Sequence, residues 1–388
     1  MKGLRRAKRI SEPELRHLDL VDQFCLVFEG VAQRSQLPST CADPRRTHQF
    51  ASYLGLFLLG ILNPVIESMR GLCAASQLRC VEEIIGGPAL SMATFSEMQS
   101  VLDPELLHAA FVQISQRCTV ANAPDPRLAR LDLVAQDGSL WRALPRMVWP
   151  QYGVGPDGNA KGVRLHLRFH LIKGVPCEAM VREGKSCERE ALRQMLQPGQ
   201  INVADRLYGK SYRLFQQGEQ AGAHFVFRLH DDCIIHEQES LPITPADATA
   251  GVVRHGWVTL GAQQDKRSIR LRLVEVRNQT HRLLLATNLS VAEATAELVG
   301  LIYRRRWQIE LFFRWIKCVL GNRHLFAESP SGVAIQLYLA LIASLLLQLY
   351  TGKRPNKRQF EAIPFFLMGW ATREELALLL RKAESKKR

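Results

Sequence analysis

The sequence predicts an α+β protein in which a mixed β-sheet core is interrupted by a β-rich insertion and flanked by helical N-terminal and C-terminal regions. Three observations support this fold class. Short helical patterns fill residues 1–125, alternating apolar strands follow a break at Pro124 and Pro126, and long apolar helical patterns return after residue 290. With 388 residues and 47% hydrophobic content, the chain can form one large core or two to three ordinary domains.

The charge balance is strongly basic. There are 51 Lys and Arg against 37 Asp and Glu, which gives a formal net charge of +14. Such a balance favours a polyanionic partner, with nucleic acid first and a membrane surface second, because cationic side chains bind phosphates and release counterions. The nine cysteines form no Cys-x-x-Cys pair, which is typical of reduced thiols in a cytosolic protein. The basic N-terminus has no apolar run behind it, so we expect no signal peptide.

Two apolar stretches, residues 53–66 and 334–350, need comparison with membrane spans. The first is too short to cross a bilayer, and the second is marginal in length and contains Gln336 and Gln348. We therefore expect two buried helices and no membrane association. Between these stretches, "GGPALSMATFSEMQSVL" combines a turn, a Ser/Thr cap and a helical run, loosely the pattern of a helix-turn-helix. Residues 1–125 are accordingly predicted to form a helical DNA-binding domain.

The central segments predict an ordered series of strands and helices. The run "RLDLVAQD" predicts a strand that ends at Asp137, with Gly138 opening a turn. Two paired strands follow at 162–172 and 174–183, then a helix at 187–196, a strand that ends at Asp205, a helix at 211–220 and a strand at 224–229. This order is that of a ribonuclease H-like core. We expect its first part at 126–229, the insertion at 230–282, its second part at 283–332 and a helical region at 333–388.

A long helix capped by Ser290 is predicted to carry the third acid of interest, Glu310. At the α-helical period one face of this helix is apolar. The other face collects Tyr303, Arg306, Trp307, Glu310, Arg314 and Lys317. A solvated face with ion pairs explains this pattern for an arbitrary helix, and a reactive site is the alternative.

A role in phosphodiester strand transfer would explain the acid, cations and aromatic side chains on the polar face of this helix. Two divalent metal ions can activate the nucleophile and neutralise the leaving oxygen, and Mg²⁺ prefers carboxylate ligands. Asp137, Asp205 and Glu310 are the three candidate catalytic acids and metal ligands. Nearby side chains are predicted to contact DNA, with Arg306 and Lys317 on phosphates and Tyr303 adding a hydroxyl. The other candidate DNA contacts are Arg206, Tyr208, Trp307 and Arg314.

Several charged residues have two interpretations. His166 and His170 share a strand face with Arg164 and Arg168, and this face is either structural or turned toward DNA. In the insertion, three arginines either contact phosphate or solubilise an edge strand. These are Arg270, Arg272 and Arg277.

The pattern Y-x2-R-x3-E-x6-K is matched in full by Tyr303, Arg306, Glu310 and Lys317. Together with the acids in "QDGS" and "VADRLYG", it resembles the DDE transposases of the insertion-sequence IS 4 family, over about residues 128–350. The resemblance implies cut-and-paste movement of DNA by two molecules on two terminal inverted repeats, with transfer of a 3′-hydroxyl end into target DNA. It also implies Mg²⁺, or Mn²⁺ as a substitute. In hairpin-forming members a flipped base stacks on tryptophan, for which Trp307 is the first candidate and Trp257 the second.

After the second acid such transposases more often have glycine where this chain has Leu207. Leucine reduces the freedom of a turn, and Gly209 is the residue expected to restore it. Two rival functions remain open: a decayed copy that only binds DNA ends, and a ribonuclease H-like nuclease that does not join them. In each case the protein would work on nucleic acid in the bacterial cytoplasm.

Overall fold

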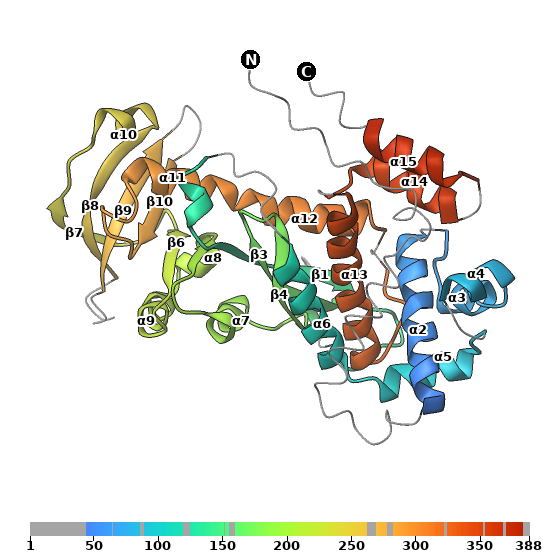
Figure 1. The fold of residues 1–388 in the computed structure, drawn as a ribbon. Coiled ribbons are helices and arrows are strands. Elements are labelled where there is room, and N and C mark those ends of the chain that lie inside the picture. Colours follow the sequence, from blue (N-terminus) through green and yellow to red (C-terminus); the bar gives the residue numbers. More distant parts are fainter. Residues whose placement is uncertain are drawn as a thin grey trace, which may run out of the picture. The chain divides into compact units, whose positions relative to one another are not determined.

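The computed structural model describes two compact units, shown in Figure 1, and covers residues 44–63, 65–85, 89–118, 125–150, 152–154, 160–261, 269–277, 282–321, 324–351, 354–367 and 370–382. One unit contains the chain up to Arg117 and again from Trp315, and the other contains residues 118–314. The helical segments at the two ends of the sequence therefore share a unit. The first 43 residues of the predicted N-terminal domain lie outside the described residues.

The sheet of the 118–314 unit contains the predicted core. After a 3₁₀ turn, Leu128–Arg130, strand β1 (Leu133–Arg142) pairs antiparallel with β3 (Ala160–His170) and parallel with β5 (Ile201–Ala204). β3 pairs antiparallel with β4 (Val175–Glu183) and with the short β2 (Tyr152–Val154), and β5 pairs parallel with β6 (His224–Arg228). The order β4-β3-β1-β5-β6 with these directions is that of a ribonuclease H-like fold, so the predicted fold class is confirmed.

β1 is longer than the sequence predicts. The expected end at Asp137 is wrong, because β3 pairs with β1 residue by residue up to Arg142. The parallel pairing with β5 stops earlier, at Ala135 opposite Val203. Asp137 therefore lies just beyond the parallel pair, at the edge where β5 ends and Asp205 follows.

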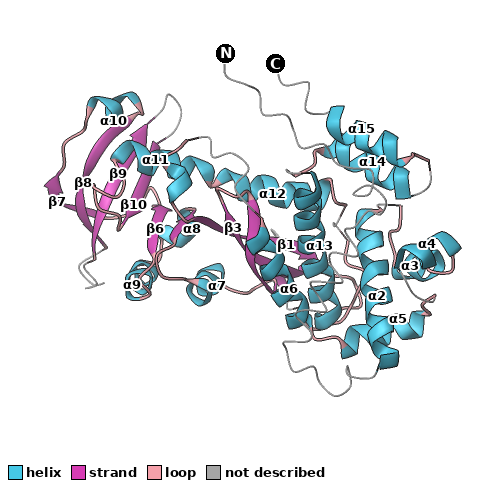
Figure 2. Cartoon of the chain, in the orientation of Figure 1, coloured by secondary structure: helices cyan, strands magenta, loops and turns pink. Residues whose placement is uncertain are grey.

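The insertion continues the same sheet, as Figure 2 shows. β10 (Arg282–Thr287) pairs with β6 and with β9 (Arg270–Arg277), and β8 (Val252–Leu260) and β7 (Ile235–Ser240) follow outward, with α10 (Pro245–Thr249) between them in sequence. β9 is thus not an edge strand. Arg272 is fully buried and donates to the Ala294 carbonyl over 2.6 Å, so neither interpretation made for Arg272 from the sequence holds.

Three helices cover one face of the core sheet: α7 (Glu188–Met195), α8 (Arg206–Gly209) and α9 (Tyr212–Gln220). Phe215 of α9 packs on Phe225 and Phe227 of β6 in a buried apolar cluster. The buried guanidinium of Arg168 donates to the Met195 carbonyl at the end of α7 over 2.6 Å. The Arg168 face of β3 is therefore covered by protein.

The opposite face carries α11 (Ala296–Arg305) and α12 (Trp307–Cys318). Arg168 and Phe169 are neighbours in a strand and point to opposite faces, and the Phe169 ring lies 5.1 Å from that of Phe312. The predicted cap at Ser290 is wrong. Thr295 caps α11 by accepting from the Leu298 amide, whereas Ser290 exchanges hydrogen bonds with Glu293 in the preceding turn.

The other unit is helical. Its described helices are α2 (Pro44–Leu62), α3 (Met69–Ala75), α4 (Arg79–Ile85), α5 (Met92–Val101), α6 (Pro104–Arg117), α13 (Pro330–Thr351), α14 (Lys357–Leu367) and α15 (Arg373–Lys382). α13 packs against α6, α2 and α5. The stretch Pro330–Leu349 is long and apolar enough to cross a membrane, yet 83% of its most apolar window is buried inside the protein. This burial agrees with the expectation of a core helix.

Candidate active site

The two predicted aspartates lie where the parallel pairing of β1 and β5 stops: Asp137 is within β1 just beyond the last pair, and Asp205 directly follows β5. Asp205 follows β5 and caps α8, with its Oδ1 accepting from the Leu207 amide over 2.9 Å. The Oδ1 of Asp137 accepts from the Gly138 amide over 2.8 Å. Burial raises the pKa of Asp137 to about 7, and the negative charges of Glu188 and Asp205 act in the same direction. The carboxylates are thus close enough to repel one another.

Glu310 lies on α12, where Arg306 holds it. The Arg306 Nη2 and the Glu310 Oε1 are 2.7 Å apart, and the side chain of Arg306 is only 14% exposed. The guanidinium carbon lies 5.8 Å from the centre of the Tyr303 ring. The positive charge of Arg306 partly offsets the rise in the pKa of Asp137. Arg306, which pairs with Glu310 and lies beside Tyr303, is therefore close enough to Asp137 for their charges to interact.

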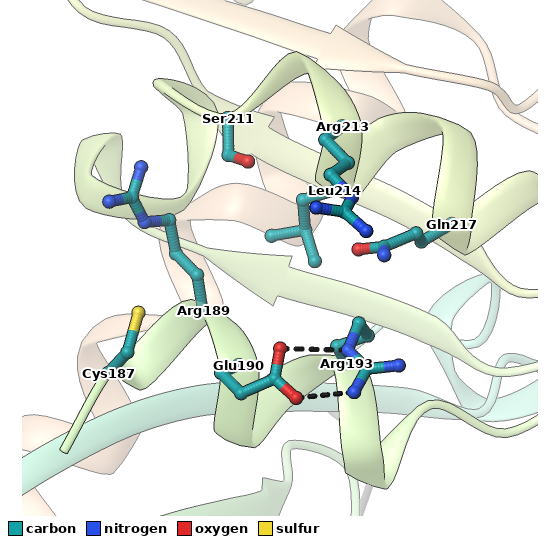
Figure 3. Close-up of a pocket in the computed structure, with 8 residues that line it drawn as sticks. All are labelled: Cys187, Arg189, Glu190, Arg193, Ser211, Arg213, Leu214 and Gln217. Atoms are coloured by element: carbon teal, nitrogen blue, oxygen red, sulfur yellow. Dashed lines mark hydrogen bonds and ion pairs between the residues drawn. The ribbon is translucent and has the colours of Figure 1, made fainter.

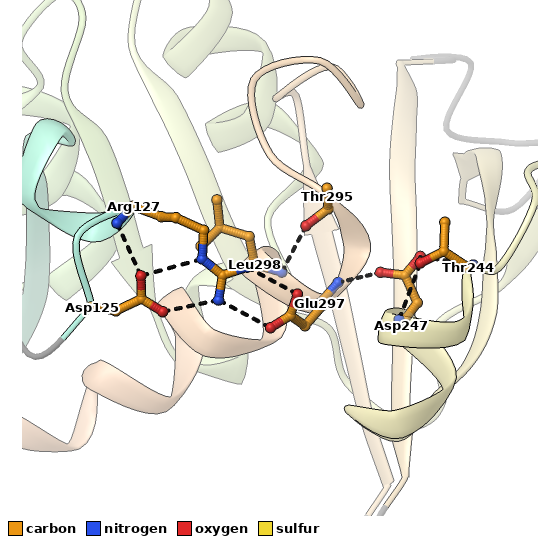
Figure 4. Close-up of polar contacts among 7 residues, drawn as sticks. All are labelled: Asp125, Arg127, Thr244, Asp247, Thr295, Glu297 and Leu298. Carbon is orange, nitrogen blue, oxygen red and sulfur yellow. Dashed lines mark hydrogen bonds and ion pairs between the residues drawn. The ribbon is translucent and has the colours of Figure 1, made fainter.

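The start of α11 is fixed from two sides, as Figure 4 shows. The guanidinium of Arg127 donates to both carboxylate oxygens of Glu297, over 3.0 and 3.1 Å, and also binds Asp125. The buried Asp247 accepts the Glu297 amide over 2.7 Å while completing a capping box with Thr244 in α10. The segment before β1 and the insertion thus both hold the helix that leads to Arg306.

The remaining predicted DNA contacts differ in exposure. Trp307 is 50% exposed, and Arg206 and Arg314 are exposed as well. Lys317 is partly buried, and burial lowers its pKa. Tyr208 needs correction: it is fully buried and its hydroxyl donates to Glu188 Oε2 over 3.3 Å. As placed, Tyr208 contacts protein and has no surface left for DNA.

Glu188, at the start of α7, was not predicted. Its side chain is 13% exposed and forms an ion pair with Arg164. Burial raises the pKa of the Glu188 carboxyl. The sequence does contain a signal, because Glu188 stands three, four and seven residues before the buried apolar residues of α7, and an acid in an apolar stripe is unusual. Those residues are Ala191, Leu192 and Met195.

The polar face of β3 is structural. His166 is fully buried, its Nε2 lies 2.8 Å from Ser186 Oγ, and burial lowers its pKa to about 4. Arg168 binds Gln200 and Asn202 in addition to the end of α7. The alternative in which this face contacts DNA is therefore wrong for His166 and Arg168.

A family model described as "Transposase DDE domain" matches residues 129–346, which is more than half of the chain. The chain belongs to the DDE transposase family. It is therefore a DNA-cleaving, strand-transferring enzyme.

Relatives of this transposase carry corresponding names. A "Probable transposase for insertion sequence element IS5377" of Geobacillus stearothermophilus is 27% identical, over 84% of this chain and 81% of the relative. A "Putative transposase for insertion sequence element IS4SA" of Synechocystis sp. is 33% identical, over 78% and 81%. The solved structure of a piggyBac transposase synaptic complex with hairpin DNA has a TM-score of 0.47 and 11% identity, over 95% of this chain and 81% of that chain.

DDE transposases generally use divalent metal ions, and the acids of this transposase fit that requirement. Within the described residues no three Asp, Glu, His or Cys side chains are already grouped as a metal site. The donor chemistry nevertheless suits a hard cation, because Asp137, Asp205 and Glu310 offer only carboxylate oxygens. A cation would also favour the charged form of Asp137, whose pKa is raised by burial and, to a smaller extent, by the negative charges of Glu188 and Asp205.

A basic pocket of about 460 Å³ lies between α7 and α9 of the transposase (Figure 3). Three arginines line it: Arg189, Arg193 and Arg213. Arg193 is paired with Glu190, with its Nε donating over 2.8 Å. Arg189 and Arg213 add further positive charge to its lining.

Proposed function

We propose that this transposase moves an insertion sequence by cut and paste. It binds the terminal inverted repeats, cleaves the DNA with Asp137, Asp205 and Glu310, and joins the freed 3′-hydroxyl to target DNA. The observation that carries the proposal is the position of Asp137 and Asp205 where the parallel pairing of β1 and β5 stops, with Arg306, which pairs with Glu310, close enough to act on the charge of Asp137. Acids of this kind can hold the divalent ions that stabilise the attacking and the leaving oxygen of an in-line phosphoryl transfer.

Asp137, Asp205 and Glu310 would hold Mg²⁺, with Mn²⁺ as a substitute. A bound divalent ion supplies charge neutralisation at the leaving oxygen and lowers the pKa of the attacking water or hydroxyl. The chain itself orients the substrate. Arg306 is the residue placed to receive a phosphate beside Glu310, and its ion pair with Glu310 would then be exchanged for a phosphate contact.

Exposed residues next to the acids suit a DNA strand. Arg206 directly follows Asp205, and Arg314 stands one helical turn after Glu310. The half-exposed indole of Trp307 offers a surface on which an unpaired base can stack, as release through a DNA hairpin would require. Trp257 is the weaker candidate for this role, because Arg270 already lies 4.9 Å from the centre of its ring.

Two copies would act together, each on one end of the element. The formal charge of +14 supports binding to a polyanion of this kind. The resulting complex is a homodimer assembled on DNA.

Cleavage of a labelled duplex that carries the inverted repeats flanking this reading frame tests the proposal. With Mg²⁺ or Mn²⁺ the native chain should nick at the repeat boundary, whereas Glu310→Gln should bind the duplex and lose at least 100-fold in nicking rate. Asp132→Asn is the matched control, because Asp132 contacts His170 and Gln200 away from the site and should cleave normally.

Two other outcomes would replace the proposal. Native protein that binds the ends and never cuts them would be a decayed copy. Native protein that cuts any duplex at the same rate would be a nuclease of the same fold.

A further inference from the structure

Glu188 contacts the elements that carry both catalytic aspartates. It lies at the first residue of α7, on the Arg164 face of the sheet, and its carboxylate receives the Arg164 guanidinium and the Tyr208 hydroxyl. Arg164 is itself fixed by a hydrogen bond of 3.1 Å from its Nε to the Gly184 carbonyl. The carboxylate is thus held in one place by partners from β3 and α8.

Gly138 makes room for this carboxylate. A Cβ at Gly138 would lie 3.0 Å from the carboxyl carbon of Glu188 and 3.2 Å from its Oε1, which is closer than side chains normally pack. Gly138 lies within β1, so a turn does not account for this glycine. Successive strand residues face opposite sides of a sheet, so Glu188 supports β1 from behind the residue next to Asp137.

Tyr208 links the same carboxylate to Asp205. It lies in α8, the single helical turn that Asp205 caps, and it is fully buried in the apolar cluster. A buried hydroxyl requires a partner, and Glu188 provides it. A shift of Glu188 would therefore be transmitted to both Asp137 and Asp205.

The charge of Glu188 matters as well as its shape. Its ion pair balances Arg164, which is only 18% exposed. A neutral side chain at position 188 would remove a negative charge that acts on Asp137 and would leave the positive charge of Arg164 without its carboxylate partner. That charge would oppose the binding of a cation.

We propose that Glu188 is a positioning residue of the catalytic site, which fixes Asp137 through Gly138 and Asp205 through Tyr208 and keeps the site negative enough to bind a divalent cation. This inference rests on the proposed function of Asp137 and Asp205. Residues that support metal ligands from behind typically change metal affinity by 10-fold to 100-fold.

Mn²⁺ binding to the DNA-free full-length chain, followed by electron paramagnetic resonance, tests the proposal without any cleavage step. Glu188→Gln retains the size of the side chain and should weaken Mn²⁺ binding about 10-fold. Gly138→Ala keeps the charge but displaces the carboxylate, so it should also weaken binding. Glu190→Gln is the matched control on the same helix, because Glu190 pairs with Arg193 outside the site, and its affinity should stay within 2-fold of native.

Circular dichroism of each variant would show whether it is folded. If Glu188→Gln does not fold, Gly138→Ala decides the matter. Native Mn²⁺ affinity in a folded Glu188→Gln or Gly138→Ala protein would overturn this inference and leave the proposed function standing. Loss of cleavage in Glu310→Gln together with native Mn²⁺ affinity in Glu188→Gln would support the proposed function and contradict the inference about Glu188.

Discussion

At the scale of single residues, the structure changes the explanation of Leu207 and Gly209. The sequence suggested that a turn at position 207 favours glycine and that Gly209 restores the lost backbone freedom. Leu207 lies in the helical turn α8, and among the described residues no amino acid other than glycine has a positive φ. A glycine at position 207 is therefore unnecessary. Gly209 is needed for space, because a Cβ there would collide with the Arg228 carbonyl oxygen. Only the packing of α8 on β6 could reveal this.

Replacing Gly209 should therefore cost much more than replacing Leu207. We expect Gly209→Ala to lower the free energy of unfolding by about 2 kcal/mol or more, since backbone must move to admit the methyl group. Leu207→Gly, which restores the residue more usual in such transposases, should cost about 1 kcal/mol of helix propensity and leave cleavage intact. Urea unfolding of both variants measures the difference, and equal losses would contradict the steric explanation.

Asp137, which cleavage requires, should lower the free energy of unfolding at alkaline pH. Its folded pKa of about 7 lies above the ordinary value of 3.8, so its contribution to stability is present below pH 3.8 and is lost as the pH rises through 7. At pH 8 without metal, Asp137→Asn should therefore raise the free energy of unfolding by roughly 1 to 3 kcal/mol while abolishing cleavage. The advantage should vanish near pH 4. An Asp137→Asn protein that is no more stable than native at pH 8 in a chelator would refute this expectation.

At the scale of elements, the local sequence pattern was enough to predict a strand or a helix wherever apolar residues recurred with a clear period. The strands β3 to β6 and the helices α7 and α9 follow from alternation and helical spacing. Two boundaries depended on distant contacts instead. The end of β1 is decided by its pairing with β3, and the start of α11 by Asp247, which lies fifty residues away in the sequence. Glu188 was missed for the same reason, because its partners come from β1, β3 and α8.

Asp247 offers a test of how the start of α11 is held. Asp247→Ala removes the acceptor for the Glu297 amide and for Thr244, so we expect a loss of about 2 to 4 kcal/mol in unfolding free energy. Hydrogen exchange should show faster opening of the first turn of α11. Asp232→Ala, at a side chain that is 86% exposed, is the control and should change neither quantity. Unchanged protection of α11 in Asp247→Ala would show that Arg127 and Thr295 suffice.

At the scale of the whole molecule, the net charge of +14 pointed to a polyanion before any site was known. The family match at residues 129–346 extends from the catalytic unit into the helical one, so the transposase domain is larger than the ribonuclease H-like core alone. Composition could not show which of the cations are free to bind phosphate. Arg168 and Arg272 are buried, whereas Arg206 and Arg314 are exposed near the acids.

Salt dependence of DNA binding distinguishes these two groups of cations. Each phosphate contact contributes about 0.9 to the slope of log K against log salt concentration, because a condensed counterion is released. Arg206→Gln and Arg314→Gln should each weaken binding to a terminal-repeat duplex and reduce that slope by about 1. Arg254→Gln, in the insertion, should leave the slope unchanged, because Arg254 is paired with Glu237 over 2.6 Å. If instead the Arg206 and Arg314 variants keep the native slope, the DNA does not pass over this edge of the sheet, and the path of the strand to the Arg306–Glu310 pair must be sought on the other side of α12.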